Sequence, residues 1–410
     1  MTTENPKFSM GRIEFVALIA MMTATIAFSI DAMLPALPEI AAELSPEIAH
    51  GAPLILTSFV LGMGLGTFFS GPLSDAFGRR NVVFGGAALY SVSAFVAWMS
   101  NSLEVMLVAR IFQGLGASGP RVVAVAIIRD LYAGREMARI MSVVMMVFAL
   151  VPAMAPMLGA GIIHTAGWRA IFIAFMAFSI ISVVWMGLRL PETLPRENRR
   201  PLRARLIIDA VRELVGHRTV RLSILVQSLA LAMLFSMIML VQPIYDTVYG
   251  RGESFPLWFG GIAVVAASAS LINALLVVRY GMRRLVSIAF GFQILLSGAM
   301  YFLNLGALPD PYGFAAFVFF QTCLFFQAGL TLGNLNAIAM EPMGHIAGMA
   351  ASVVGAISTV LAALIASPVG LMFDGTTKPL ALAMLLMASG AYALMLYMGR
   401  MENRQPAAAE

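Results

Sequence analysis

Residues 52–80 read APLILTSFVLGMGLGTFFSGPLSDAFGRR, an apolar run that ends in a short polar loop. The apolar part is long enough to cross a bilayer, because a membrane helix needs about 20 apolar residues at a rise of about 1.5 Å each. Gly71 and Gly78 permit a tight turn after it, and Arg79 and Arg80 anchor the loop at the membrane surface. This stretch predicts a membrane-spanning helix followed by a loop that returns the chain.

The composition of the whole chain extends this prediction. Of the 410 residues, 60% are hydrophobic and 11% are charged, against roughly 25% charged residues in an ordinary soluble domain. A water-soluble chain could not cover so much apolar surface, whereas lipid accepts it. The basic residues are scattered between apolar runs, so the formal net charge of +5 does not indicate nucleic-acid binding. We expect an all-α protein embedded in the lipid bilayer.

The apolar runs predict twelve transmembrane helices. They lie near 13–37, 52–72, 82–100, 103–128, 140–163, 169–190, 221–245, 255–279, 284–307, 312–334, 346–371 and 378–399. The longest polar interval divides the chain into an N-terminal six-helix bundle (1–190), a basic cytoplasmic linker (191–220) and a C-terminal six-helix bundle (221–410). The linker is expected to contain a short amphipathic helix around Leu206 to Val215, which is either a solvated tether or a lipid-binding element.

The two halves show a faint repeat. Phe77-Gly78-Arg79-Arg80 follows the second span, and Tyr280-Gly281-Met282-Arg283-Arg284 follows the eighth, which is the second span of the other half. Repeated halves are typical of secondary transporters, in which the substrate site lies between the halves near the membrane midplane. The repeat therefore predicts two pseudo-symmetric bundles.

The positions of the basic residues predict the orientation, because Lys and Arg are enriched in cytoplasmic loops. With the N-terminus inside, most of the 26 Lys and Arg residues fall on the cytoplasmic side, and only Arg169, Arg251 and Lys378 fall outside. We therefore expect both termini to be cytoplasmic.

Among 21 acidic residues, only Asp31 falls well inside a predicted span. A membrane-buried acid usually faces a protein interior or a cavity and has a function. Arg110, on the fourth span, is expected at a similar depth, about 10 Å below the outer surface. Burial raises the pKa of an acid and a nearby cation lowers it, so Asp31 is our candidate proton carrier, with Arg110 tuning or relaying the proton. The alternative is a static pair that joins two helices.

Arg121 lies on the same stripe of the fourth span as Arg110, since the two are eleven residues apart and such residues share a helix face. It either attracts anionic groups in a cavity or extends to the inner interface. Both interpretations stay open at this point.

Several other side chains are candidates for contact with a substrate. Soft or aromatic side chains suit varied hydrophobic ligands, and buried amides need a partner. Lipid-facing packing and hydrogen bonds between helices explain such residues equally well. The candidates besides Asp31 and Arg110 are Gln113, Met145, Met146, Phe148, Gln227, Gln242 and Tyr245.

The sequence contains no signature of catalysis. It lacks the Gly-x-x-x-x-Gly-Lys loop of nucleotide hydrolases and a Ser-His-Asp arrangement in a credible context. The histidines are not grouped as metal ligands. We expect no enzymatic activity, no metal and no cofactor other than protons.

The loop from Gly71 to Arg80 resembles the loop signature of the major facilitator superfamily. The resemblance implies a conformational latch that holds the two halves in the outward-open state. Its residues here are Gly71, Asp75, Gly78, Arg79 and Arg80, with Asp130 as an arginine partner.

Two further segments are similar to motifs of the same superfamily. Leu107 to Gly119 (LVARIFQGLGASG) resembles the arginine motif of proton-coupled members, with Arg110 as its key residue. Val151 to Ala160 (VPAMAPMLGA) resembles the antiporter motif through Pro152, Pro156 and Gly159, although alanines at 155 and 160 replace glycines of the general pattern.

Three segments narrow the resemblance to the bicyclomycin/chloramphenicol resistance group of bacterial drug:proton antiporters. They are DAMLPALP (31–38), PETL (191–194) and MEPMGHIAGMA (340–350). The resemblance implies a monomer in the bacterial cytoplasmic membrane that exports small hydrophobic or amphipathic drugs by alternating access. The alternative is a dedicated metabolite exporter or importer of the same fold; a channel or an intramembrane enzyme would need a polar pore or a catalytic constellation.

Overall fold

The computed structural model describes residues 10–46, 51–199, 201–202 and 204–404. The two chain ends, 1–9 and 405–410, lie outside the described residues. Within the described part, twelve helical segments are long and apolar enough to cross a membrane. They are Arg12–Leu44, Leu54–Phe77, Arg79–Met99, Leu103–Leu131, Gly134–Ala166, Ala170–Arg189, Arg218–Val248, Phe255–Tyr280, Met282–Phe302, Tyr312–Met343, Met349–Leu371 and Lys378–Met401. The predicted number of spans is thus confirmed, with ends that differ by several residues.

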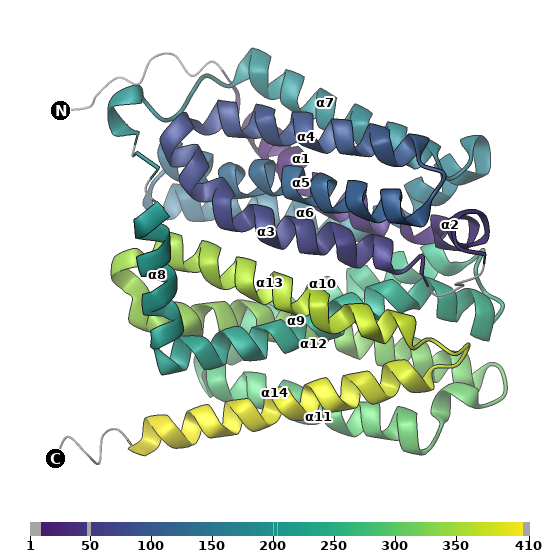
Figure 1. The fold of residues 1–410 in the computed structure, drawn as a ribbon. Coiled ribbons are helices and arrows are strands. Elements are labelled where there is room, and N and C mark those ends of the chain that lie inside the picture. Colours follow the sequence, from purple (N-terminus) through teal and green to yellow (C-terminus); the bar gives the residue numbers. More distant parts are fainter. Residues whose placement is uncertain (1–9, 47–50, 200, 203, 405–410) are drawn as a thin grey trace.

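The spans form two bundles that lie side by side (Figure 1). The first contains α1 (Arg12–Asp31), α3 (Leu54–Phe77), α4 (Arg79–Met99), α5 (Leu103–Leu131), α6 (Gly134–Ala166) and α7 (Ala170–Arg189). The second contains α9 (Arg218–Pro243), α10 (Phe255–Tyr280), α11 (Met282–Phe302), α12 (Tyr312–Met340), α13 (Ala347–Leu371) and α14 (Lys378–Arg404). Short elements join them: η1 (Leu34–Ala36), α2 (Leu37–Leu44), η2 (Arg196–Asn198), the π-helix η3 (Ile244–Val248), η4 (Leu305–Ala307) and η5 (Glu341–Ile346).

The linker contains the predicted amphipathic helix, α8 (Ala204–Gly216). It lies across the ends of the spans, on the side of the molecule where the described chain begins and ends (Figure 1). Leu214 is fully buried and joins a small apolar core with Val220 and Ile224 of α9 and Val354 of α13. The buried side of α8 therefore fixes it to the C-terminal bundle.

The sequence pattern predicted a continuous first span, but the structure breaks it. Helix α1 ends at Asp31, and the span continues through η1 and α2 to Leu44. Pro35 explains the break, because a proline lacks the N–H that would bond to the carbonyl four residues earlier, and its ring clashes with that carbonyl. Here that carbonyl belongs to Asp31. The break places the buried acid at a helix end.

The bundles touch mainly along two pairs of helices, α3 with α13 and α6 with α10. A Cβ atom added at Gly260 of α10 would lie 2.6 Å from the backbone oxygen of Ala153 in α6. A Cβ atom added at Gly64 of α3 would lie 2.9 Å from a methyl carbon of Val360 in α13. Small residues let helices approach this closely within a membrane. The two contacts belong to the interface between the bundles.

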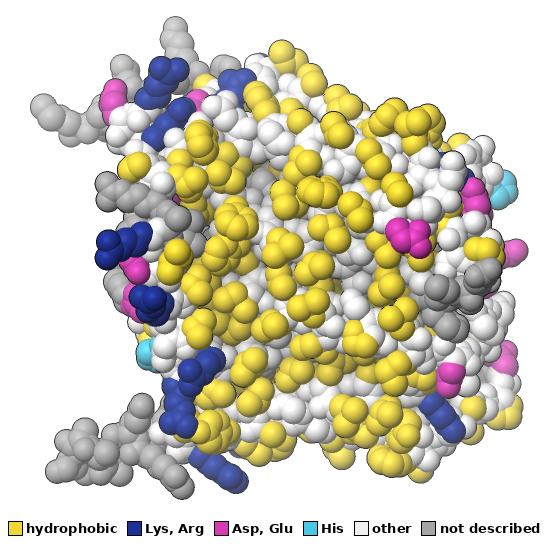
Figure 2. All heavy atoms as spheres, viewed as in Figure 1, with side chains coloured by type: hydrophobic (Ala, Val, Ile, Leu, Met, Phe, Trp, Pro, Cys, Tyr) yellow, Lys and Arg dark blue, Asp and Glu magenta, His cyan; other side chains and the backbone are white. Residues whose placement is uncertain are grey.

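The outer surface matches a lipid environment. Hydrophobic side chains cover the middle of the visible face, and Lys and Arg gather at the edge where α8 and the described chain ends lie (Figure 2). Few basic side chains are visible at the opposite edge (Figure 2). This distribution follows the pattern from which the orientation was predicted.

Candidate functional site

Arg110 lies in the middle of the N-terminal bundle and is fully buried. Its Nη2 donates to the backbone oxygen of Ser29 (3.0 Å), its Nη1 to Oε1 of Gln113 (2.8 Å) and its Nε to the backbone oxygen of Ile55 (3.3 Å). The guanidinium carbon lies 4.3 Å from the centre of the Phe59 ring. The arginine thus joins α1, α3 and α5 through neutral partners.

The break after α1 makes this arrangement possible. The last four carbonyls of a helix have no partner within the helix, and they carry its negative dipole end. Ser29 lies in the last turn of α1, so its carbonyl is free to accept from Arg110. The guanidinium therefore caps the C-terminal end of α1, where a cation is stabilising.

Tyr90 of α4 completes the hydrogen-bond network and was not singled out in the sequence. Its hydroxyl lies 2.5 Å from the hydroxyl of Ser29 and is almost fully buried. Because the Ser29 hydroxyl donates to the backbone oxygen of Thr25 (2.6 Å), the Tyr90 hydroxyl is the donor in this contact. A tyrosine alone gives no signal in a sequence; its role becomes visible only when α4 is placed beside Ser29.

Asp31 is the last residue of α1, two residues after Ser29, and is 5% exposed. Among the described residues, no hydrogen bond or ion pair involves its carboxylate, and none joins it to Arg110. The structure thus places the two predicted proton-coupling residues near the same helix end without a direct pair. The static pair between the first and fourth spans is not present in this conformation.

The residues expected to form the latch lie at the end of the N-terminal bundle next to α8. Arg79 donates from Nε to Oδ2 of Asp130 (2.9 Å) and from Nη1 to Oδ1 of Asp75 (2.5 Å). Gly78 has a φ of 96°, which favours glycine because it has no Cβ atom. Gly71 faces α13 of the other bundle, with Oγ of Ser352 3.6 Å from the position of a Cβ atom. The side chain of Arg80 donates to the backbone oxygen of Gly187 (2.9 Å) instead of joining the carboxylates.

The segment PETL supplies further partners to this cluster. The carboxylate of Glu192 accepts from the backbone N–H groups of Arg79 (2.9 Å) and Arg80 (3.1 Å), the first two residues of α4. The hydroxyl of Thr193 donates to Oδ2 of Asp130 (2.9 Å). Glu192 thus satisfies backbone donors at the beginning of a helix, where a negative charge is favourable. The start of the linker is tied to the latch.

The C-terminal bundle contains a related ion pair. Arg283, at the start of α11, lies 2.7 Å from Oε2 of Glu341, directly after α12. Its place in the repeat corresponds to that of Arg79 with Asp130, since each pair joins the start of the third span of its half to the end of the fourth. The repeat seen in the sequence therefore extends to these contacts.

The antiporter-like motif packs against the break in the first span. Pro152 and Pro156 lie inside α6, which continues past both. A Cβ atom added at Gly159 would lie 2.0 Å from the backbone oxygen of Ala32, the residue after Asp31. Only a glycine allows this approach without a shift of one helix. The motif thus contacts the chain next to the buried acid.

The remaining substrate candidates fall into different surroundings. The hydroxyl of Tyr245 donates to Oε1 of Gln321 on α12 (3.0 Å) within a cluster of aromatic rings, which is a hydrogen bond between helices. Among the described residues, the side-chain oxygens of Gln227 and Gln242 and Nε2 of Gln113 have no hydrogen-bond partner. Met145 and Met146 are exposed and Phe148 is half-buried. Each of these three amides thus keeps one buried atom without a partner, whereas the Tyr245 hydroxyl has one.

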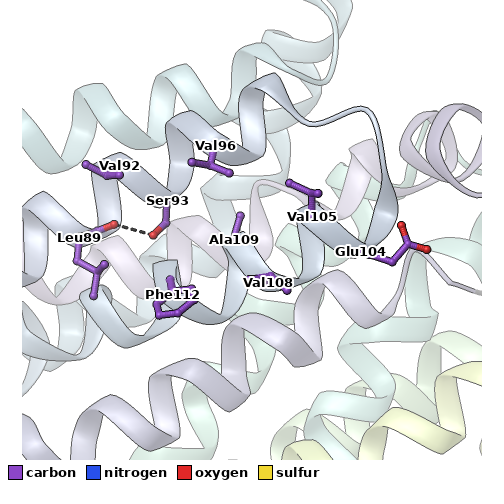
Figure 3. A pocket seen from close by; sticks show the side chains of 9 residues that line it. All are labelled: Leu89, Val92, Ser93, Val96, Glu104, Val105, Val108, Ala109 and Phe112. Carbon is purple, nitrogen blue, oxygen red and sulfur yellow. Dashed lines mark hydrogen bonds between the residues drawn. The ribbon is translucent and has the colours of Figure 1, made fainter.

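A groove of about 440 Å³ lies between α4 and α5 (Figure 3). Its lining includes Val92 and Val96 of α4 and Val105, Val108 and Phe112 of α5, all of which are exposed. Val105, Val108 and Phe112 lie on the side of α5 opposite to Arg110, which is fully buried. The groove therefore belongs to the lipid-facing surface and is separate from the buried network.

Comparison with known proteins gives one family. The model of the Major Facilitator Superfamily matches residues 17–367. The chain is 29% identical over 378 residues to the bicyclomycin resistance protein homolog of Haemophilus influenzae, covering 90% of this chain and 92% of that protein. It is 25% identical over 377 residues to the multidrug resistance protein MdtL of Shewanella oneidensis, covering 91% and 93%.

Solved structures show the same fold. The crystal structure of a D-xylose-proton symporter aligns with a TM-score of 0.72 and 15% sequence identity, over 94% of this chain and 97% of that one. At this identity the likeness concerns the arrangement of helices alone.

Proposed function

The chain belongs to the major facilitator superfamily, and we propose that it exports small amphipathic drugs or related compounds from the bacterial cytoplasm in exchange for protons. The observation that carries the proposal is the buried, unpaired carboxylate of Asp31 at the arginine-capped end of α1. The names of two relatives, which refer to bicyclomycin resistance and to multidrug resistance, support drugs as the cargo. Both bundles are present in one chain, so the proposed transporter acts as a monomer.

Asp31 is the proposed proton carrier. A charge inside a membrane protein is expensive unless it is paired, so an unpaired carboxyl group in this position is best accommodated with its proton. Release of the proton leaves a carboxylate near Arg110, whose present partners are neutral carbonyl and amide oxygens. The carboxylate then competes with Ser29 for the guanidinium. Loss of the Arg110–Ser29 hydrogen bond would loosen the end of α1, which couples proton release to a change in packing.

The bundle interface supports the proposed alternating access. In this proposal the bundles rock along the α3–α13 and α6–α10 contacts, and the Arg79–Asp130 latch stabilises one of the two orientations. The end that carries α8 faces the cytoplasm, because the basic side chains gather there. Gly64 and Gly260 keep the helices close together at both contacts.

A growth screen tests the function directly. The chain is expressed in a bacterial host that lacks its own drug exporters, and resistance is measured across antibiotic classes with and without a protonophore. Resistance to several amphipathic classes that the protonophore abolishes is expected, and Asp31→Asn should remove it. Asp209→Asn, which alters an exposed acid of α8, is the matched control and should retain it.

Protection against a single compound would instead favour the dedicated metabolite transporter. Resistance that persists in Asp31→Asn or in the presence of the protonophore would contradict the proton-coupled mechanism.

A further inference from the structure

Arg121 has weaker partners than Arg79 of α4 and Arg110 of its own helix. Arg79 binds two carboxylates, and Arg110 has three oxygen acceptors and an aromatic ring. Among the described residues, the one hydrogen bond of Arg121 runs from its Nη1 to the sulfur of Met63 (3.6 Å), and a thioether is a weak acceptor. Among the described residues, no carboxylate forms an ion pair with Arg121.

The side chain of Arg121 points toward the membrane midplane. In a helix each Cα–Cβ bond is tilted toward the N-terminus, and α5 begins at the end of the bundle remote from α8. Met63, which Arg121 contacts, lies beside the middle of α5, since its backbone nitrogen is 2.8 Å from the position of a Cβ atom on Gly114. Arg121 is ten residues before the end of α5 at Leu131, or about 15 Å from it. An arginine that extended to the near interface would point the other way.

Arg121 also lies on the inner side of α5. Arg110, Gly114 and Ala117, which share its stripe, are all buried, whereas Val108 and Phe112 on the other side are exposed to lipid. Arg121 itself is nevertheless exposed. An exposed side chain on an otherwise buried, inward-facing stripe borders a space inside the protein, near the depth at which transporters of this architecture bind substrate.

We propose that Arg121 binds an anionic oxygen group of the cargo, such as a carboxylate, sulfonate or phosphate. This inference rests on the proposed export function and narrows its substrates to compounds that combine an apolar body with one such group. An unpaired cation in the membrane interior is strongly unfavourable, and a bidentate guanidinium–oxyanion pair is the arrangement that satisfies it best. The neutral Asp31 proposed above leaves the positive charge of Arg121 available to the cargo.

Binding to the full-length protein in neutral detergent tests the assignment, with no gradient present. The probes are three matched pairs: 1-naphthylacetic acid, indole-3-acetic acid and biphenyl-4-acetic acid, each beside its own carboxamide. Each acid should bind the wild type about tenfold more tightly than its amide, as expected for a charge-assisted hydrogen bond. Arg121→Gln should reduce the affinity for the acids to that for the amides and leave the amides unchanged.

Two variants serve as controls, and both should keep the preference for acids. Arg121→Lys retains the charge, and Arg129→Gln removes an exposed arginine from the same helix. Where Arg121→Gln does not yield monodisperse protein, Arg121→Met replaces it. Equal binding of acid and amide to the wild type, absence of binding by either, or a preference that persists without Arg121 would overturn the inference. An Arg121-dependent preference for acids without proton release on binding would uphold it and contradict proton coupling instead.

Discussion

The Nη2 of Arg110 donates a hydrogen bond to the backbone oxygen of Ser29 at 3.0 Å, two residues before the buried carboxyl of Asp31. This hydrogen bond connects Pro35 of the first span with Arg110 of the fourth, which look unrelated in the sequence. Pro35 ends α1 and frees its last carbonyls, and Arg110 of α5 finds its acceptor there. A helix end therefore holds the guanidinium in place of a carboxylate.

The first prediction concerns the shape of the Arg110 side chain. Arg110→Lys keeps the charge but has a compact ammonium in place of three separately directed donors. We expect at least a tenfold loss of efflux, because hydrogen bonds to charged groups are worth about 1.5–3 kcal/mol each. The loss is measured as drug efflux from whole cells, normalised to the amount of transporter in the membrane.

Protein levels decide between two interpretations of that result. If folded Arg110→Lys and Arg110→Ala protein both accumulate normally, the loss concerns transport. Loss of folded protein would show instead that Arg110 mainly joins α1, α3 and α5. Arg139→Lys, which changes an exposed arginine of α6, should behave as the wild type.

The sequence predicted the fold well because each span repeats the same strong signal. Each hydrophobic run predicts its own span, and the basic loops between the runs predict the direction of the spans. The helix ends were less predictable. Tyr312–Met343 extends beyond the predicted 312–334, because Asn334 and Asn336 interrupt the apolar run while the helix continues.

The candidate site was predictable only in part. Asp31 and Arg110 stand out because charges are rare in spans, yet their expected pairing requires a geometry that the sequence does not contain. Ser29 and Tyr90 gave no signal, since a serine and a tyrosine occur in many spans without a function. Pro35 was visible, and its position four residues after Asp31 predicts the helix end by itself. Contacts between distant segments, such as Glu192 with the start of α4, require the packed structure.

The second prediction concerns the proton. Asp31→Asn should abolish the release of protons when a drug is added to purified protein, because an amide has no titrating group. Drug binding itself should persist, since the amide has nearly the same size. A pH-sensitive dye in weakly buffered solution follows the release. Proton release of wild-type size from Asp31→Asn would remove Asp31 from the carrier role, and Asp374→Asn, at an exposed loop position, is the control.

The third prediction concerns the contact between α6 and the broken first span. Gly159→Ala places a methyl group 2.0 Å from the backbone oxygen of Ala32, so one helix must shift. Overpacking of this kind costs about 1–3 kcal/mol, and we expect both a lower melting temperature and a several-fold loss of efflux. Gly161→Ala is a matched control on the same helix, because no atom lies within 4 Å of its added Cβ atom. Identical behaviour of the two variants would mean that the close contact does not matter for transport.

The fourth prediction concerns Glu192, which connects the linker to the latch. Glu192→Gln replaces a carboxylate that accepts from the N–H groups of Arg79 and Arg80, so the beginning of α4 loses a favourable negative charge. Loss of a helix-capping interaction costs about 1 kcal/mol, which should lower the melting temperature of the purified protein by a few degrees.

Because Arg79 also binds Asp130, the latch should weaken as well in Glu192→Gln, and cross-linking of cysteines placed at positions 71 and 352 should decrease. Glu197→Gln removes an exposed acid of the same linker and should change neither measurement. A lower melting temperature with unchanged cross-linking would confine Glu192 to the stability of α4 and separate it from the latch.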